Sequence, residues 1–323
     1  MPVLALAPKL RFLSYLQSES SDFVSYEVEP SRLTGGLDAR LYRYKLVGQG
    51  PRVLRILRPA HEVEELFHHQ VVHQILNQQG LKVPLIHHVC ADKSVLGGVF
   101  AVMDLVPGQT LFELAPERHA KVLGESMARM HDLDVRPIVE ALRRAGVPDE
   151  RFLSPVVHQK ALDLFEQKSP WAADLMAWLR DHLPLDGDNL SVIHGDYHAG
   201  NLMFEHDSIS GVLDWGFCIS DPAVDLAHTM NLYMIACPQV YPAYPTFLPH
   251  ISEQIIDGIL KAYQMIRPLN DQLIAVFRVA HIFSFLAAGA AGVGPEFMRR
   301  PESQCEYLAL IEQMTGLTLS PSA

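Results

Sequence analysis

Two short segments in the C-terminal half of the sequence hold the side chains best suited to chemistry. The segment VIHGDYHAGNLMF, residues 192–204, contains Asp196 and, five positions later, Asn201. Ten residues further on, GVLDWGF places Asp214 at the end of an apolar run. Carboxylate and amide oxygens are hard ligands that suit Mg²⁺, and a carboxylate that binds no metal can accept a hydroxyl proton. Phosphoryl transfer needs this combination of metal ligands and an aimed hydroxyl.

The elements around these residues are expected to bring them together. The runs LMF and GVLDW predict a hairpin, linked by the polar turn EHDSIS. Hairpin pairing places Asn201, at the start of one strand, close to Asp214, at the end of the other. Asp196 lies in the loop just before them, so two carboxylates and one amide surround one small volume.

Two other interpretations of these segments are open at this point. Asp and Asn favour turns, so each of the three residues could serve turn geometry alone. The histidines His194, His198 and His206 also invite a zinc site. Their spacings of four and eight residues fall across a loop and a hairpin and not on one helix face, which disfavours zinc.

The pattern HGDYHAGN, followed by VLDWG and DPAVDLA, resembles the aminoglycoside phosphotransferase and choline kinase family, relatives of the protein kinases. The spacing of His194, Asp196 and Asn201 is that of the kinase catalytic loop H-x-D-x-x-x-x-N, and Asp214 stands where protein kinases have the Asp of D-F-G. The resemblance implies that Asp196 is the catalytic base and that Asn201 and Asp214 hold Mg²⁺. It further implies that His194 supports the loop and that Asp225 braces it from a helix start.

The order of predicted elements agrees with this family. Residues 26–58 predict three antiparallel strands joined by two turns, 61–79 a helix, and KVPLIHHVC and GGVFAVMDLV two further strands. From about residue 115 onward the pattern is mainly helical. We therefore expect an α+β, two-lobed, protein-kinase-like fold with a helical extension at 1–25, a small antiparallel-sheet N-lobe at 26–106, and a larger helical C-lobe at 107–323. The helix histidines, including His68, His69 and His73, are expected to be solvated.

The resemblance also implies where a nucleotide, ATP or GTP, binds. Glycines in the first strand turn let backbone N–H groups approach phosphate oxygens closely, and a cation on the third strand contacts phosphate. Backbone groups of the segment that connects the lobes hold the base. In this sequence the residues concerned are Gly35, Gly36, Arg55, Asp104, Leu105 and Val106.

Two positions depart from the kinase pattern. Arg55 stands where kinases carry a Lys, and the two cations bind phosphate with different geometry. His69 stands where the helix Glu that pairs with this Lys is expected, although Glu64 and Glu65 lie about one turn earlier. These departures motivate an alternative, a nucleotide-binding pseudokinase without turnover. Transfer of a nucleotidyl group is a third hypothesis, because it uses similar parts.

The composition limits the class of protein and its partners. A length of 323 residues exceeds one compact core, and a net charge of −11 argues against a nucleic-acid protein. Four scattered cysteines without a CxxC pair favour the cytoplasm, and the weakly polar run at 282–294 is too short to span a membrane. The expected partner is a small-molecule hydroxyl acceptor, and Asp221, Glu296 and Glu302 are candidates for contacts with it.

Overall fold

The computed structural model describes residues 4–22, 25–33, 39–58, 63–153, 169–183, 189–240, 249–292 and 295–319. The chain divides into two compact units. The first unit comprises Met1–Gln109, Arg136–Val147 and Met203–Leu213, and the second comprises Thr110–Val135, Pro148–Leu202 and Asp214–Ala323. The segments 136–147 and 203–213 thus belong to the first unit, although the sequence-based boundaries assigned them to the C-lobe.

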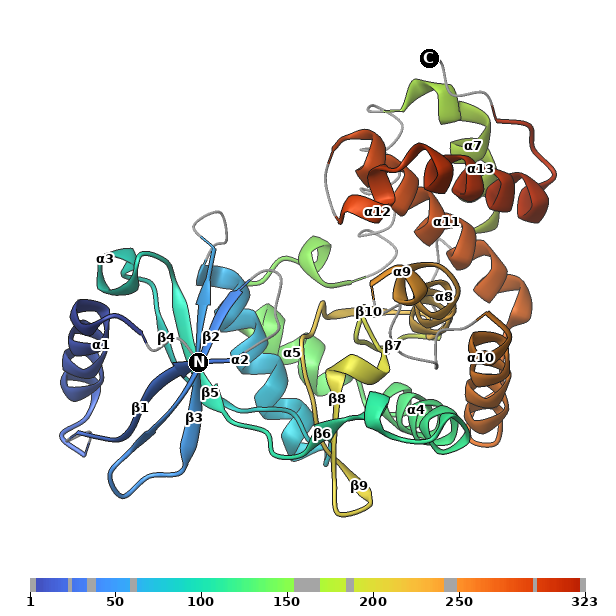
Figure 1. The fold of residues 1–323 in the computed structure, drawn as a ribbon. Helices are drawn as coiled ribbons and strands as arrows, with labels where there is room; N and C mark the ends of the chain where they lie inside the picture. The colour runs from blue at the N-terminus through green and yellow to red at the C-terminus, as the bar shows by residue number, and fades with distance from the viewer. Residues whose placement is uncertain are drawn as a thin grey trace. The chain divides into compact units, whose positions relative to one another are not determined.

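The first unit is built on a five-stranded sheet with the order β1-β2-β3-β5-β4, in which all neighbouring strands are antiparallel (Figure 1). This confirms the three strands predicted within 26–58 and the two predicted after the helix. The strands are β1 Tyr26–Arg32, β2 Ala39–Leu46, β3 Pro51–Leu57, β4 Ile86–Cys90 and β5 Phe100–Asp104. The helices of this unit are α1 Leu6–Glu19, α2 Val63–Gln78, α3 Lys93–Leu96 and α5 Arg136–Arg144.

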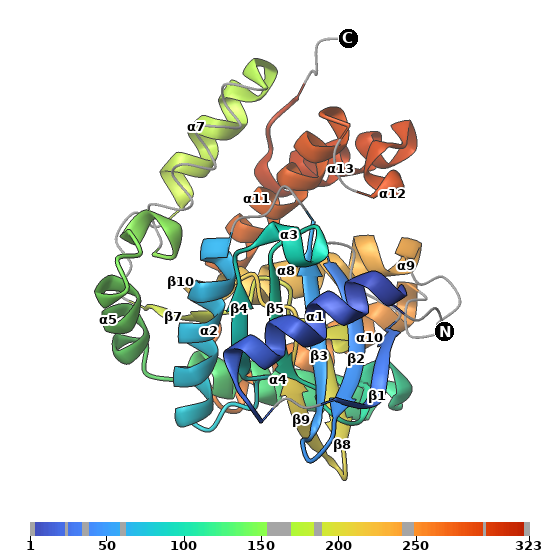
Figure 2. The same cartoon turned by 90° about the vertical axis from the view of Figure 1, so that its left-hand side faces the viewer.

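Helix α1 covers one face of this sheet, as Figure 2 shows. Its side chains Phe12 and Leu16 are buried with residues of β2, β3 and β5. The Phe12 ring packs edge-on against Tyr44 at 5.2 Å and against Phe100 at 5.7 Å. The predicted N-terminal extension therefore supplies part of the core of the first unit.

Helix α2 contributes to the core on the opposite face. Its residue Leu66 is buried with Val53 and Leu57 of β3 and with residues of β4 and β5. Side chains alternate between the faces of a strand, so Arg55 lies on the same face as Val53 and Leu57. Arg55 is partly buried there. The strand pleat thus directs the arginine of β3 toward the face that α2 covers.

The histidines of α2 correct one prediction. His69 and His73 are buried, with 9% and 3% of their surface exposed, and their rings stack with centroids 5.9 Å apart. The His73 Nδ1–H donates to the carbonyl of Pro84 at 2.8 Å. A neutral imidazole whose N–H finds a carbonyl can be buried at little cost, which explains the burial of His73, and the expectation of solvation is wrong for both residues.

The hairpin predicted after Asn201 is present, with a shorter turn than expected. It consists of β8 Leu202–Glu205 and β9 Ser208–Val212, and β6 Gln109–Thr110 completes a three-stranded sheet in the order β6-β8-β9. His206 and Asp207 have φ of 47° and 63°, which are the positive values that a two-residue hairpin turn requires. The residues Ser208 to Ser210, predicted as turn, are part of β9.

The second unit is mainly helical and contains one short antiparallel strand pair, β7 with β10. Its long central helix α11 contacts α7, α8, α12 and α13 and contains eight buried residues. By length and composition α11 could cross a membrane, but half of its apolar window is buried inside the protein. The longer helices are α4 Pro116–His131, α7 Ala173–His182, α8 Ala223–Asn231, α10 Pro249–Gln264, α11 Asp271–Ala290 and α13 Pro301–Thr315. The shorter elements are η1 Leu111–Glu113, η2 Asp149–Arg151, η3 Pro170–Ala172, β7 Ser191–Ile193, η4 Ala199–Asn201, β10 Cys218–Ser220, the π-helical turn η5 Leu232–Ala236, α9 Cys237–Val240 and α12 Glu296–Arg299.

Candidate active site

Asp225, in the first turn of α8, holds the loop between β7 and η4 in place. The Asp225 carboxylate accepts the backbone N–H groups of His194 and Gly195, both at 2.8 Å. It also accepts His131 Nε2–H at 3.1 Å, and His131 Nδ1 in turn accepts the Tyr263 hydroxyl at 2.9 Å. Burial acts to raise the pKa of Asp225, but these donors outweigh it and the pKa lies below its ordinary value. A fully buried carboxylate thus holds the start of the loop in one conformation.

His194 is fully buried and serves the loop itself. Its ring packs on Trp215 with centroids 4.6 Å apart, and its Nδ1 accepts the backbone N–H of Asp196 at 3.1 Å. Its carbonyl accepts the backbone N–H of Gly216 at 2.9 Å, which ties the loop to the segment after β9. Gly195, between His194 and Asp196, has φ of 84°, a left-handed value that glycine adopts without strain. Among the described residues no three His, Cys, Asp or Glu side chains gather as a zinc site of this kind would require.

Asp196 is the partly exposed carboxylate of the loop, with 40% of its side chain accessible. The Asn201 amide donates to its carbonyl at 2.9 Å and to its carboxylate at 3.1 Å. The Nε2 atoms of His198 and His228 lie 3.5 Å and 3.7 Å from the two carboxylate oxygens. Burial acts to raise the pKa of Asp196, yet the two imidazoles outweigh it and hold the pKa well below its usual range. The carboxylate is therefore ionised and ready to accept a hydrogen bond.

Asn201 and Asp214 are the residues predicted to hold a divalent cation. Because the amide nitrogen of Asn201 donates to Asp196, its amide oxygen faces the other way. Asp214 is exposed just beyond the end of β9 and has φ of 56°, while its neighbour Trp215 packs on His194. Two hard oxygen donors on adjoining loops fit Mg²⁺, which takes one or two carboxylates and completes its shell with water and phosphate oxygens.

Two residues of this region were not found from the sequence. His228 lies three positions after Asp225 on α8, and that spacing alone places both on one helix face. His281 lies on α11, and its ring stacks on His228 with centroids 3.8 Å apart. No local pattern connects His281 to the loop, because the contact depends on how α8 and α11 pack.

The residues predicted to bind the nucleotide lie in the first unit. Arg55 is at the middle of β3, opposite Leu41 and Ala101 in the sheet register. The Asp104 backbone N–H donates to the carbonyl of Leu85 at 3.0 Å, so it is engaged within the sheet. Leu105 and Val106 follow β5 directly, in a segment without regular secondary structure. The predicted residues Gly35 and Gly36 lie outside the described residues.

The side chain of Asp104 anchors the end of β5. It pairs with Arg52 at 2.7 Å and with His87 at 2.8 Å, and it accepts the backbone N–H of Leu85 at 3.0 Å. The carboxylate thus links β3, β4 and the residues before β4 at the point where the chain leaves the sheet.

The acids suggested for acceptor contacts have other partners in the structure. Asp221 accepts the backbone N–H of Ala223 at 2.8 Å and the amide of Asn189 at 3.2 Å. Glu296 is exposed and pairs with Arg300 at 3.7 Å, and Glu302 is exposed on α13. These contacts bear on Asp221 and Glu296, and a contact of any of the three acids with an acceptor stays a prediction.

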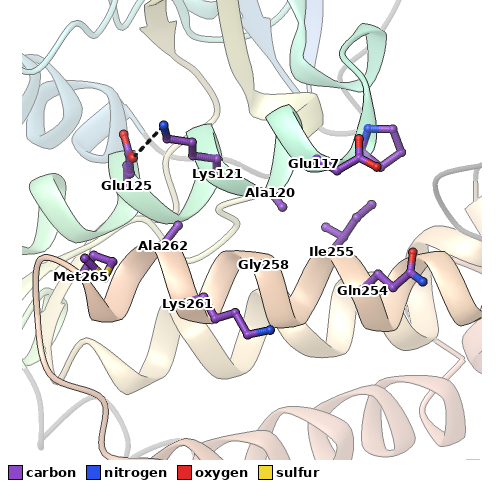
Figure 3. A pocket seen from close by; sticks show the side chains of 11 residues that line it. Glu117, Ala120, Lys121, Glu125, Gln254, Ile255, Gly258, Lys261, Ala262 and Met265 are labelled. Atoms are coloured by element: carbon purple, nitrogen blue, oxygen red, sulfur yellow. Dashed lines mark ion pairs between the residues drawn. The ribbon is translucent and has the colours of Figure 1, made fainter.

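A separate pocket of about 420 Å³ lies between α4 and α10 (Figure 3). The two helices approach closely because Gly124 faces the carbonyl of Ile259, where a Cβ atom would be only 2.3 Å away. Lys121 and Glu125 form an ion pair of 3.8 Å on its α4 side. None of the predicted site residues line this pocket, so we do not assign it to the reaction. Its lining residues are Pro116, Glu117, Ala120, Lys121, Glu125, Gln254, Ile255, Gly258, Lys261, Ala262 and Met265.

The antiparallel sheet unit, the helical unit and the braced loop with Asp196 define a phosphotransferase of the protein-kinase-like fold. The chain belongs to the phosphotransferase enzyme family, whose model matches residues 29–248.

Curated relatives match the chain over part of its length. Acyl-CoA dehydrogenase family member 11 of Gallus gallus is 30% identical over 230 residues, which is 63% of this chain and 29% of the relative. The homoserine kinase of a Methylobacterium strain is 26% identical over 215 residues, 62% of each chain. The chain thus spans less than a third of the length of the acyl-CoA dehydrogenase relative that it matches.

Solved structures share the fold at lower identity. The ethanolamine kinase of Plasmodium vivax is similar with a TM-score of 0.63 and 16% identity, over 96% of this chain and 87% of that one. The amicoumacin kinase hAmiN, in complex with AMP-PNP, Ca²⁺ and its ligand Ami, has a TM-score of 0.62 and 15% identity over 96% of both chains. At these identities the likeness shows the fold alone.

Proposed function

We propose that the chain is a Mg²⁺-dependent kinase that transfers the γ-phosphoryl group of ATP or GTP to a hydroxyl of a small molecule. The observation that carries this proposal is the state of Asp196, an ionised and partly exposed carboxylate whose backbone is fixed through His194 and whose side chain is held by Asn201. A protein without turnover has no need for a charged acceptor group held so firmly.

In this proposal Asp196 orients the acceptor. One oxygen of its carboxylate accepts the hydrogen bond of the acceptor hydroxyl and aims the hydroxyl oxygen at the γ-phosphorus. As the new O–P bond forms and the bond to the β-phosphate oxygen breaks, the hydroxyl proton passes to the carboxylate. His198 and His228 keep Asp196 ionised until then, because they favour its charged form.

Asn201 and Asp214 would hold the divalent cation through their side-chain oxygens. The cation supplies neutralisation of the phosphate charge as it moves to the leaving diphosphate. The hydrogen bond from Asn201 to Asp196 makes the position of the amide depend on the catalytic carboxylate. This hydrogen bond would keep the Asn201 amide oriented beside Asp196 when a cation binds.

The nucleotide contacts are proposed for the first unit. Arg55 would bind phosphate through its guanidinium fork. Since the N–H of Asp104 is engaged with Leu85, the hydrogen bonds to the base would come from Leu105 and Val106. The amicoumacin kinase, which shares the fold, is in complex with AMP-PNP and Ca²⁺, and this supports a nucleotide with a divalent cation.

Hydroxylated acyl compounds are the acceptor class to test first. Relatives at up to 30% identity are named acyl-CoA dehydrogenases, and this region covers less than a third of their length. A phosphotransferase region beside a dehydrogenase region suggests that both act on one acyl substrate. Homoserine, named by another relative, is the second acceptor to include.

The test compares the wild type with D196N in the presence of Mg²⁺ and either ATP or GTP. We expect the wild type to add one phosphoryl group to an acceptor, measured by mass spectrometry of the product. D196N should lower turnover by about 100-fold or more, while calorimetry finds its nucleotide affinity unchanged. A product carrying a whole nucleotidyl group would contradict phosphoryl transfer. Nucleotide binding by a wild type that turns over no acceptor would indicate the pseudokinase.

A further inference from the structure

A row of four polar side chains extends away from Asp196 along the contact between α8 and α11. We call His228 and Asn231 of α8 together with Arg278 and His281 of α11 the α8–α11 row. On each helix the two residues are three positions apart and therefore share one face. The two helices pack side by side (Figure 1).

Direct contacts join the members of this row. The rings of His228 and His281 stack at 3.8 Å, and the Asn231 amide donates to the carbonyl of Arg278 at 3.0 Å and towards His281 Nδ1 at 3.4 Å. The Arg278 Nε–H donates to the Asn231 amide oxygen at 3.0 Å. Since His228 lies 3.7 Å from the carboxylate of Asp196, the row leads from the catalytic loop to the guanidinium of Arg278.

Arg278 is partly buried, yet within the described ranges no carboxylate pairs with it. Its Nη2 contacts the sulfur of Met234 at 3.4 Å, and a thioether is only a weak acceptor. Burial lowers the pKa of Arg278, and no charged group among the described residues acts against this effect. Other partly buried arginines have acids, as Arg52 has Asp104 and Arg267 has Asp132.

A purely structural role would leave most of this guanidinium unused. Nε–H alone makes the bond to Asn231 that joins the two helices, so the planar fork of the η nitrogens is not needed for that bond. Removing a cation from water without an anion is unfavourable, and a guanidinium fork matches carboxylate and phosphate oxygens. An anionic ligand is the best source of the negative charge that would pair with the Arg278 guanidinium.

We propose that Arg278 binds an anionic group, a carboxylate or a phosphate, of the same acceptor whose hydroxyl Asp196 orients. This assignment rests on the proposed function. The acceptor must reach past the stacked rings of His228 and His281, so its hydroxyl and its anionic group are separated by a linker. Such an acceptor is negatively charged, whereas an amino alcohol is positively charged.

Four probes of equal chain length test this inference: ω-hydroxyhexanoate, ω-hydroxyhexyl phosphate, ω-hydroxyhexanamide and ω-aminohexanol. Phosphorylation is measured with saturating nucleotide and Mg²⁺, and binding of each probe is measured by calorimetry. The wild type should favour one or both anionic probes over the amide by about tenfold or more in kcat/KM, mainly through KM. The carboxylate and phosphate arms identify which anion is preferred.

The variants R278Q and R278K separate charge recognition from folding. R278Q should lower kcat/KM for the anionic probes by about tenfold or more and leave kcat/KM for the amide within about twofold of the wild type. For the anionic probes, kcat/KM of R278K should lie between those of R278Q and the wild type. The matched control is R129Q, because Arg129 is exposed on α4. An equal loss for all probes in R278Q would mean a structural role and overturn the proposal.

The same measurements distinguish failure of the inference from failure of the proposed function. If the wild type phosphorylates the amide or the amine in preference to both anions, the kinase function stands and the role of Arg278 is wrong. If the anions bind with an affinity that R278Q abolishes but no probe is phosphorylated, the anion site stands and the kinase function is in doubt. If the anionic probes neither bind nor react, the anion site is refuted.

Discussion

The Nε2 atom of His228 lies 3.7 Å from one carboxylate oxygen of Asp196, and His198 approaches the other oxygen at 3.5 Å. The His228 ring is itself held by its stack on His281. The two imidazoles lie near different oxygens of the carboxylate and favour its charged form, so they limit the orientations in which it stays paired with both. The orientation of Asp196 therefore depends on α8 and α11 and not only on its own loop.

The variant H228F tests this dependence. Phenylalanine preserves the stack on His281 but has no N–H for the carboxylate, so we expect kcat to fall by about tenfold with nucleotide affinity unchanged. The measurement is steady-state turnover at saturating acceptor and nucleotide. H250Q is the control, because His250 is exposed on α10. An unchanged kcat in H228F would mean that His198 and the loop suffice to orient Asp196.

The variant D214N tests the metal site without disturbing its backbone. Asp214 has φ of 56°, a left-handed value that Asn tolerates, so the substitution changes charge and leaves the loop conformation in place. We expect the Mg²⁺ concentration for half-maximal activity to rise by about tenfold or more, because one anionic ligand is lost. Titration of activity with Mg²⁺ measures this shift. An identical titration curve for D214N and wild type would remove Asp214 from the metal site.

The geometry of the loop could be predicted because its parts are local in sequence. Asp196 and Asn201 are five residues apart in one loop, and the Asn201 amide contacts Asp196, while the hairpin that follows pairs as its sequence pattern predicts. Asp225, assigned as a brace, holds the backbone of the loop as expected. Only the turn was misjudged, since positive φ at two consecutive residues allowed it to be two residues long.

The residues that were missed depend on contacts distant in sequence. His281 meets His228 only because α8 and α11 pack together, and the run HIFSF indicates an apolar core helix equally well without that contact. His73 was expected in solvent, but a carbonyl of Pro84 accepts its N–H and permits burial. Histidine is neutral or charged according to its partners, so its burial cannot be inferred from the residue type.

The variant D225N tests the brace of the loop. An Asn side chain keeps the shape but offers one acceptor oxygen where the carboxylate offers two, and its NH₂ group would face a backbone N–H. We expect the free energy of unfolding to fall by about 3 kcal/mol or more, since a buried hydrogen-bonded charge is lost. Urea unfolding measures this difference. The control D132N changes an exposed Asp of the same unit, and equal stability of D225N and D132N would contradict the brace.

His119 predicts a pH dependence of stability. It is fully buried on α4, its Nε2 bonds the Tyr233 hydroxyl, and burial, with a smaller contribution from the charge of His198, lowers its pKa to about 4. The unfolded chain, with an ordinary pKa near 6.5, binds the proton first as the pH falls. Stability is therefore complete above about pH 6.5 and declines between about 6.5 and 4.

Between about pH 7.5 and about pH 5 the expected decline for His119 is about 2 kcal/mol, and His281 adds to it because burial lowers its pKa in the same direction. Urea unfolding at about pH 7.5 and about pH 5 measures the difference. In H119Q the amide can still bond Tyr233, so the stability at the higher pH should be nearly kept while the loss on acidification becomes smaller. H250Q should retain the full loss, because His250 is exposed in both states. Equal losses in H119Q and wild type would show that another group controls acid stability.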